Sequence, residues 1–386
     1  MRDSVVVRAP LKLVLAGEYA VLDPGSPGIV AAIDRYVTCR AEPASDVELV
    51  AVGLKTGFLR GPAPGGKGEL ELEPGASEAG DLGFARSALD IGYRYVAELF
   101  GERPRPLKLT CDSRAGLLER DGGPPIKLGL GTSAASTVAI VGALLIAHGV
   151  PIDRATFARA GFRLALLAHE EAQGGLGSGI DVAGSAVGGL VEYTRPDPRL
   201  RRRLPGRESP LAAVRGPWPG LHVEALPVPL GMRLLVGFTG KSAATTDLVR
   251  AVERWRRDRP NDYEPFARRT RRAVQALGQA LRHGHAPGVL AAIHTARETL
   301  VFLGERAHVA IETPELERLI EVANAADAEA KPSGAGGGDC GIAIAFDLKT
   351  ADRVLAGWRE AGISPVPVEI ARFGLHEKAE KRAATS

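Results

Sequence analysis

The sequence is poor in cysteine and in aromatic residues. Its 386 residues include only Cys39, Cys111 and Cys340, with no Cys-x-x-Cys spacing, and aromatic residues make up 5%. So few and scattered cysteines argue against a disulfide framework and against a zinc site, and they are typical of a reducing compartment. Scarce aromatic residues argue against a platform on which nucleic-acid bases stack.

Long apolar runs are also missing. The longest, residues 137–147, is well below the roughly 20 residues that a membrane-spanning helix needs, and the first apolar run is too short for a secretory signal. We therefore expect a cytoplasmic protein with no membrane partner. The net charge of +3 is too small to predict nucleic-acid binding, and we interpret the basic run 199–203 as a solvated loop. A monomer and a homodimer are both open.

The composition, 45% hydrophobic and 25% charged, is that of a globular protein with a full core, and the length suggests about two domains. Strand-like and helix-like runs are mixed without a regular βαβα alternation, which predicts the α+β class. The proline-rich segment 195–220 predicts a linker, so we expect domains at 1–200 and 221–386.

Hydrophobic periodicity predicts the individual elements. Strands are expected at 5–7, 12–16, 29–41, 107–111, 189–193, 233–237, 341–346 and 366–370, and a loop or hairpin at 60–80. Helices are expected at 84–100, 134–148, 155–172, 246–256, 261–283, 287–303, 313–328 and 350–361.

The segment Gly129-Leu-Gly-Thr-Ser-Ala-Ala135 directly precedes the strongly apolar helix expected at 134–148. Glycines let backbone amides approach an anion closely, and the helix start adds unpaired donors. Thr132 and Ser133 offer hydroxyl groups to a phosphate or to Mg²⁺, and Lys127 supplies a positive charge. The segment is therefore a candidate phosphate-binding loop, although a glycine turn that only caps a buried helix fits the same residues.

Two familiar nucleotide motifs are matched only superficially. The Gly129-x-Gly131-x-x-Ala134 spacing fits a loose dinucleotide pattern, which needs a buried strand just before it, whereas the preceding residues 121–125 are expected to form a turn. Gly240-Lys241-Ser242 resembles the end of a Walker A motif, but the glycine required five positions earlier is Leu235. We reject both.

Two further glycine-rich segments strengthen the case for an anionic ligand. One is Gly174-Gly-Leu-Gly-Ser-Gly-Ile-Asp181, which ends on an acid, and the other is Lys331-Pro-Ser-Gly-Ala-Gly-Gly-Gly-Asp-Cys-Gly341. Either segment alone is usually structural. Three such loops in a chain of ordinary composition predict close backbone approach to an anion.

In this order, the loops resemble the motifs of the GHMP kinases, named for galactose, homoserine, mevalonate and phosphomevalonate. The first motif is seen in Ala9-Pro-Leu-Lys-Leu-Val-Leu-Ala-Gly-Glu-Tyr-Ala-Val21, the second at 129–135, and the third at 332–341. Thr132 stands where the family usually has serine. The Ala172-Gln-Gly element and the Asp339-Cys340 ending are most similar to the phosphomevalonate kinase subgroup.

This resemblance implies a fold and an activity. The fold would be a ribosomal-S5-like β-α-β N-terminal domain followed by a ferredoxin-like C-terminal domain. The activity would be ATP-dependent and Mg²⁺-dependent phosphorylation of phosphomevalonate, a small-molecule substrate, to diphosphomevalonate. Mevalonate or homoserine as acceptor, a diphosphomevalonate decarboxylase, and a non-catalytic ligand-sensing homologue remain alternatives. The last would be expected to lose Lys12, Ser133 or Asp181, and all three are present.

The resemblance also implies roles for single residues. Lys12 and Asp181 would be catalytic, and an ammonium beside a carboxylate favours electrostatic stabilisation over general-base action. Glu170, or its neighbour Glu171, would bind Mg²⁺ together with Ser133. ATP phosphates would be held by Lys127, Gly129, Leu130, Gly131, Thr132, Ser133, Ala134 and Ala135.

The acceptor would need cations and hydrogen-bond donors, because phosphomevalonate is anionic at both ends. His169 and His294 are expected to be polar surface or capped residues with no role. The candidate substrate-binding residues are Gly17, Glu18, Ser178, Lys241, Arg297, Ser333, Gly334, Ala335 and Gly336, with Lys127 as a further cation.

Overall fold

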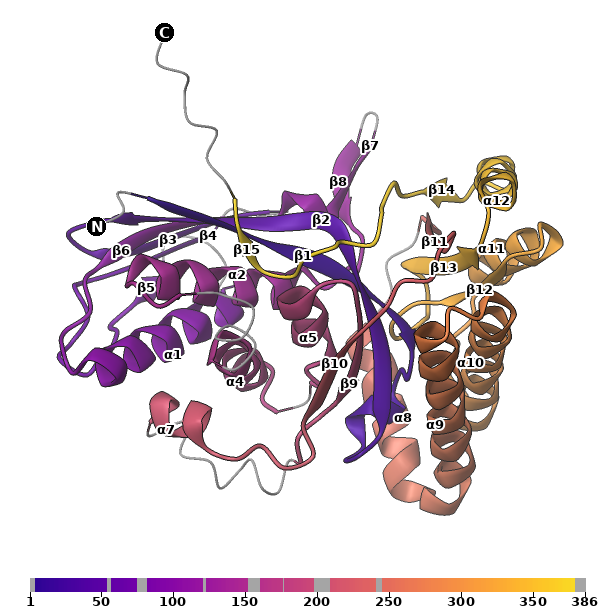
Figure 1. Cartoon of the computed structure of the whole chain (residues 1–386), viewed down its shortest axis with the longest axis horizontal. Helices are drawn as coiled ribbons and strands as arrows, with labels where there is room; N and C mark the ends of the chain where they lie inside the picture. The colour runs from indigo at the N-terminus through magenta and orange to yellow at the C-terminus, as the bar shows by residue number, and fades with distance from the viewer. Residues whose placement is uncertain are drawn as a thin grey trace, which may run out of the picture.

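The computed structural model describes residues 4–53, 57–74, 82–120, 123–151, 160–175, 177–197, 209–240 and 245–378. The described strands form a nine-stranded sheet, a four-stranded sheet and a two-stranded hairpin, with helices packed around them (Figure 1).

The large sheet is built around the long strand β2. Residues 27–31 of this strand pair with β9, and residues 38–43 pair with β6. The order is β10-β9-β2-β6-β3-β4-β5, with β1 between β2 and β15, and β3 with β6 is the parallel pair. The strands are β1 (Val5–Ala16), β2 (Pro27–Pro43), β3 (Val47–Val52), β4 (Gly57–Gly61), β5 (Glu73–Pro74), β6 (Leu107–Asp112), β9 (Leu190–Thr194), β10 (His222–Leu226) and β15 (His376–Glu377).

Four helices lie on one side of this sheet (Figure 1), of which α2 (Thr132–Ala147) and α5 (Ile180–Val187) pack against its strands, whereas α1 (Gly83–Phe100) and α4 (Phe162–Ala172) pack on α2. In α2, twelve of 16 residues are buried. A helix that is apolar on all sides belongs in a core, and α2 lies between the sheet and helices α1 and α4, with α5 beside it. The helix start, and the glycine loop before it, are thereby fixed. The short helix α7 (Pro210–Arg215) lies against α1.

The smaller sheet is antiparallel, in the order β12-β13-β11-β14. Helices α9 and α10 lie side by side, and α9 also contacts β1 and β2, so one apolar core extends through both sheets. The elements are β11 (Arg233–Phe238), α8 (Thr245–Asp258), α9 (Pro260–Arg282), α10 (Ala286–Ala307), α11 (Pro314–Ala325), β12 (Glu329–Pro332), β13 (Cys340–Ala345), α12 (Leu348–Glu360) and β14 (Ser364–Pro365).

The hairpin of β7 (Leu117–Arg120) and β8 (Gly123–Lys127) leads directly into the first glycine loop. The turn predicted at 121–125 is therefore wrong for 123–125, and residues 121–122 lie outside the described part. The dinucleotide pattern still lacks its context, because β8 belongs to an antiparallel hairpin and not to a buried βαβ unit.

The break expected between strands at 5–7 and 12–16 is wrong. Both ranges are strand, as predicted, but they belong to one strand, β1, because a register shift after Pro10 accommodates the proline. The strand expected at 366–370 is also wrong. These residues contribute the bridge between Ile370 and Ile33 and single backbone hydrogen bonds, in which the Val366 amide donates to Val236 and the Asp34 amide donates to Glu369.

Other predicted elements are found only in part or fall on residues outside the described part, and some observed strands were not predicted. In the helix predicted at 155–172, residues 162–172 form α4 and residues 152–159 lie outside the described part. Of the loop or hairpin expected at 60–80, the part up to residue 74 is confirmed as a hairpin by the pairing of β4 with β5, and residues 75–80 lie outside the described part. The basic run 199–203 is also outside the description. Strands β3 and β10 are additions that the periodicity did not indicate.

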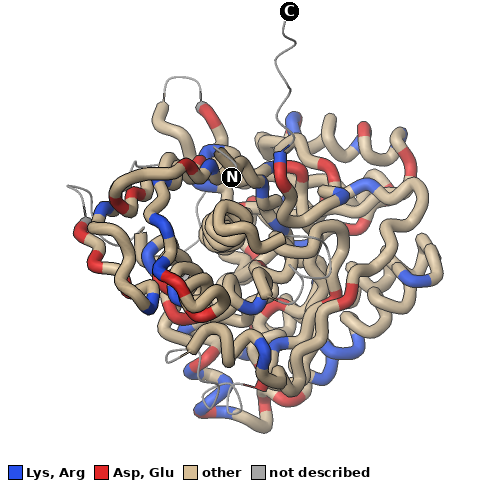
Figure 2. Tube along the Cα trace, turned by 60° about the vertical axis from the view of Figure 1, so that its left-hand side comes forward, with Lys and Arg blue, Asp and Glu red and all other residues tan. Residues whose placement is uncertain are grey.

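Charge is distributed over the molecule: Figure 2 shows Lys and Arg interspersed with Asp and Glu along the trace. The three cysteines are free and buried. Among the helices described, none has the length and apolar character needed to cross a membrane.

Candidate active site

The first glycine loop, residues 129–135, comprises the turn that follows β8 and the first residues of α2. Gly129 and Gly131 have φ values of 67° and 79°, in the region that favours glycine. A Cβ atom on Gly131 would lie 2.6 Å from Cε of Lys12, and one on Gly129 would lie 2.6 Å from Oδ2 of Asp339. Both positions therefore need glycine, for backbone conformation and for space.

The start of α2 has the properties of an anion site. Gly131 precedes the helix without a side-chain cap, so the first amides of α2 are directed at the loop. Thr132 and Ser133 are half-buried in this first turn. Lys127 is exposed at the end of β8, where it pairs with Leu117.

Lys12 lies in β1, and its Nζ is 3.3 Å from Oδ1 of Asp181 in the first turn of α5. The Lys12 side chain is 8% exposed and that of Asp181 is 33% exposed. The Lys12 amide donates to the carbonyl oxygen of Leu130 (3.0 Å), which joins β1 to the glycine loop. The two predicted catalytic side chains thus meet beside the predicted phosphate loop, with the carboxylate partly open to solvent.

The third glycine loop, residues 333–338, contains four glycines with positive φ. It is bonded to the first motif: Ser333 Oγ donates to the carbonyl oxygen of Val14 (3.1 Å), and Tyr19 OH donates to that of Ala335 (2.6 Å). The other side of the loop is held by the Gly337 amide, which donates to Ile311 (2.8 Å).

The end of the third loop contacts the first loop. The Cys340 thiol donates to the carbonyl oxygen of Leu128 (3.3 Å), and burial raises the pKa of that thiol. Asp339 has a φ of 44°, and its carbonyl oxygen accepts from the amide and hydroxyl of Thr239 (3.0 and 3.1 Å). These contacts bring residues from β1, α2, α5 and β13 to one place.

Glu18 and Ser178 differ in accessibility. Glu18 is 3% exposed and forms a salt bridge with the fully buried Lys331. Ser178 is half-buried in the loop before α5, where its Oγ accepts from the Ile180 amide (3.3 Å). The hydroxyl of Tyr193 donates to the Ser178 carbonyl oxygen (2.8 Å).

Glu170 and Glu171 lie on α4, which packs against α2. Glu170 is 9% exposed, whereas Glu171 is exposed and its Oε2 accepts from Ser87 Oγ (3.4 Å). Of the two, Glu170 is the one enclosed among the helices around the site.

The surface position expected for His169 is wrong. This residue is 3% exposed beside Phe84, with ring centroids 4.8 Å apart. Burial lowers the pKa of the imidazole to about 4, with a smaller opposing contribution from Asp181, so the ring is neutral at pH 7. Its helix buries the face that holds the histidine, which the polar His-Glu-Glu sequence does not indicate. His294 is exposed at the surface, as expected, with ring nitrogens near Glu298 and Glu329.

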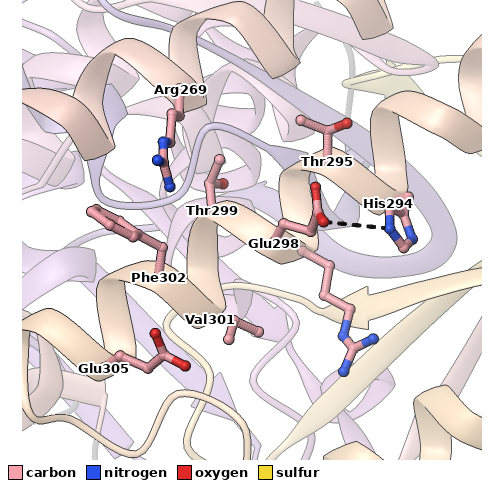
Figure 3. Close-up of a pocket in the computed structure, with 9 residues that line it drawn as sticks. Arg269, His294, Thr295, Glu298, Thr299, Val301, Phe302 and Glu305 are labelled. Atoms are coloured by element: carbon pink, nitrogen blue, oxygen red, sulfur yellow. Dashed lines mark ion pairs between the residues drawn. The ribbon is translucent and has the colours of Figure 1, made fainter.

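Arg297 lies on α10 in a bidentate pair with Glu312 (2.9 Å and 2.9 Å). It lines a surface hollow of about 580 Å³ formed by α9 and α10. Figure 3 shows Arg269 and Phe302 facing this hollow; the guanidinium lies 4.4 Å from the ring centroid. No residue of the glycine loops lines it. Lys241 lies outside the described residues.

Two residues of the site, Asp339 and Lys331, were not predicted as functional residues from the sequence. Asp339 lies against Gly129, and Lys331 pairs with Glu18. Both stand within the third glycine segment, so the signal was present. Their partners are far away in the sequence, and the spacing alone did not identify them.

Comparison with known proteins agrees with this geometry. Residues 91–189 match the family model described as GHMP kinases N terminal domain, and residues 272–364 match GHMP kinases C terminal. The chain is 36% identical over 383 residues to a phosphomevalonate kinase of Streptomyces sp. (strain CL190), covering 96% of this chain and 98% of the relative. It is 27% identical over 388 residues to a mevalonate kinase of Pyrococcus horikoshii, covering 97% and 98%.

Solved structures are also similar to this chain over nearly its whole length. A Lin0012 protein from Listeria innocua superimposes with a TM-score of 0.87 at 29% identity, covering 98% of this chain and 100% of that one. The Streptococcus pneumoniae phosphomevalonate kinase in complex with phosphomevalonate and AMPPNP superimposes with a TM-score of 0.77 at 25% identity, covering 95% and 99%. The expected α+β class is confirmed, while the domain limits near 195–220 stay a prediction. The chain belongs to the GHMP kinase family.

Proposed function

We propose that this protein transfers the γ-phosphoryl group of ATP to the phosphate of phosphomevalonate, which gives ADP and diphosphomevalonate. The observation that carries the proposal is the meeting of Lys12 and Asp181 beside the 129–135 loop. It is supported by the full-length similarity to the Streptomyces enzyme, which is named for this reaction.

Phosphoryl transfer depends mainly on positioning and on neutralising charge. Lys12 Nζ is held by Asp181 and by the close approach of Gly131, so its charge is fixed before substrate arrives. A preorganised charge in a largely enclosed place stabilises the charge that develops in transfer. Asp181, being accessible, fixes Lys12 and positions the acceptor. This role does not require it to remove a proton.

The residues present fit a nucleotide and a divalent cation. The positive φ values of Gly129 and Gly131 leave a backbone surface without side chains before α2, which suits the ATP phosphates. Ser133 and Glu170 would hold Mg²⁺, which takes few protein ligands and keeps water and phosphate oxygens for the rest. When bound, the cation would neutralise phosphate charge.

The anionic acceptor needs donors at its two ends. Ser178 lies two residues before the helix that carries Asp181, and Ser333 begins the third loop, so both are candidates on the described chain. Lys127, two residues before Gly129, is a further cation beside the first loop in sequence, and Lys241, outside the described residues, stays a candidate from the sequence alone. Arg297 is the weakest of the predicted set, because Glu312 already occupies its guanidinium. The free thiols agree with a cytoplasmic enzyme.

An ADP-release assay with phosphomevalonate, mevalonate, homoserine and galactose in parallel tests the proposal. We expect ATP-dependent turnover on phosphomevalonate, loss of it with excess EDTA, and recovery on adding Mg²⁺. Turnover on mevalonate but not on phosphomevalonate would overturn the choice of acceptor while leaving the kinase activity in place.

A further inference from the structure

Three side-chain contacts link the third loop to the first motif. Lys331 Nζ contacts Glu18 Oε1, Tyr19 OH donates to the carbonyl oxygen of Ala335 (2.6 Å), and Ser333 Oγ donates to that of Val14 (3.1 Å). We call these contacts the β1–loop link. They connect residues more than 300 positions apart in the chain and join β1, which carries Lys12, to the start of the 333–338 loop.

The charged members of the link are closed to substrate. Lys331 is 0% exposed and Glu18 is 3% exposed, and Lys331 Nζ also donates to the Pro332 carbonyl oxygen (2.7 Å). Two charges without access to water cannot bind a molecule that diffuses in. Such a pair is also weak evidence for stability, because well-packed apolar side chains often serve as well. Its place in the molecule therefore points to a geometric role.

The backbone on the first-motif side of the link is tightly constrained. Gly17 has a φ of 102°, and a Cβ there would lie 2.6 Å from Cα of Gly28. Tyr19 has a φ of 61°, which is uncommon for a residue with a side chain. Glu18 stands between these two residues, so its carboxylate has little freedom to follow a displaced loop.

We propose that Glu18 and Lys331 are positioning residues that fix the 333–338 loop relative to Lys12 and Asp181. This inference rests on the proposed phosphoryl transfer and assigns Glu18 a role through the loop and not through substrate contact. Displacement of a reacting group by about 1 Å can cost about 100-fold in rate. Loss of the link should therefore lower kcat, whereas nucleotide affinity, set by the 129–135 loop, should change little.

The test compares Glu18→Gln/Lys331→Met with Arg256→Met in the full-length enzyme. The double variant removes both charges together, so no uncompensated charge is buried. The control removes the ion pair between Arg256 and Asp23 (2.7 Å), which also connects the first-motif region to the C-terminal half but does not reach the loop.

For the double variant we expect kcat to fall about 100-fold, the Kd for AMPPNP to stay within about threefold, and amide hydrogen exchange at 333–338 to accelerate. Arg256→Met should keep kcat and loop exchange near the parent values. A double variant with parental kcat, or with parental exchange at 333–338, would overturn the proposal. A fall in kcat of the same size in Arg256→Met would also overturn the proposal.

A second variant covers failure of the double variant to fold. Tyr19→Phe removes only the hydroxyl that donates to Ala335 and leaves no buried charge. It should lower kcat about fivefold to tenfold, as one hydrogen bond of about 1 kcal/mol implies, and should accelerate exchange at 334–336. Unchanged kcat and exchange would count against the link. If the parent enzyme has no activity on phosphomevalonate, the proposed function fails, whereas the exchange measurements still decide whether the link holds the loop.

Discussion

Two lysine–carboxylate pairs lie on the first motif, and they differ in access to water. In one, Lys12 meets Asp181, whose side chain is 33% exposed; in the other, Glu18 meets Lys331, and neither is more than 3% exposed. The chemical groups are the same. The accessible pair can touch a substrate and take part in its chemistry, whereas the closed pair can act only on the geometry of the protein around it.

The difference in access to water also predicts how much stability is lost when one partner of each pair is removed. Removing one member of a closed ion pair leaves a charge without a partner in a place that water cannot reach. Removing Lys12 from the accessible pair leaves Asp181, whose charge solvent can partly screen because its side chain is 33% exposed. Activity should therefore depend most strongly on the Lys12/Asp181 pair, and stability on the Glu18/Lys331 pair.

The largest effect is expected for Lys12→Met and Asp181→Asn. Each should lower kcat by about 10²–10⁴-fold, the range that loss of a positioned charge or proton acceptor produces, while AMPPNP still binds. Single-turnover kinetics and calorimetric titration separate the two quantities. Near-normal turnover in either variant would show that the accessible pair has no direct role in catalysis, and the proposed difference between the two pairs would then be wrong.

Next in size is the stability of the single variant Lys331→Met. It should lower the free energy of unfolding by about 3–5 kcal/mol, because Glu18 is left buried without its partner. For Lys12→Met the loss should be on the order of 1 kcal/mol, since Asp181 stays partly hydrated. Urea unfolding of both variants measures the difference, and equal losses would contradict it.

A smaller effect on activity is expected for Gly131→Ala. The added Cβ would lie 2.6 Å from Lys12 Cε and would displace the ammonium, so kcat should fall roughly tenfold to 100-fold. Gly149→Ala is a matched control, with a similar φ of 82° but nothing within 4 Å of the added atom. It should cost only the backbone strain, about 1 kcal/mol, and leave kcat unchanged.

The smallest effect is expected on the outer face of α9 and α10. Arg269→Ala removes a guanidinium that lies over Phe302 at the surface hollow, and such exposed contacts contribute about 0.5–1 kcal/mol. Thermal unfolding should shift slightly, and kcat should match the parent. A large loss of kcat would mean that the catalytic region extends to this face.

Local sequence signals predicted most of the fold. The apolar run that predicts a helix at 134–148 is α2, Thr132–Ala147, because a continuous apolar segment of this length has to be buried. The continuity of β1 was missed because Pro10 normally ends a strand, whereas here a register shift absorbs it. The strand expected at 366–370 is replaced by a short pairing farther on, at β15.

The site was predicted in part. Lys12, Asp181 and the 129–135 loop come together as the family resemblance implied. The partner of Glu18 could not be read from the sequence, because the pairing of residues 313 positions apart depends on how the two sheets pack. The burial of His169 likewise depends on which side of α4 faces α1.

The position of β15 has a consequence for the order in which the protein is made. β15 pairs with Val7 and Arg8 of β1, and Leu375 packs against α2 at Gly142. The ribosome therefore releases the strand that carries Lys12 long before the segment that closes its outer edge. Until that segment emerges, the nascent chain has an open strand edge available to other chains, so this edge of the catalytic strand is closed only after every strand of the four-stranded sheet has been made.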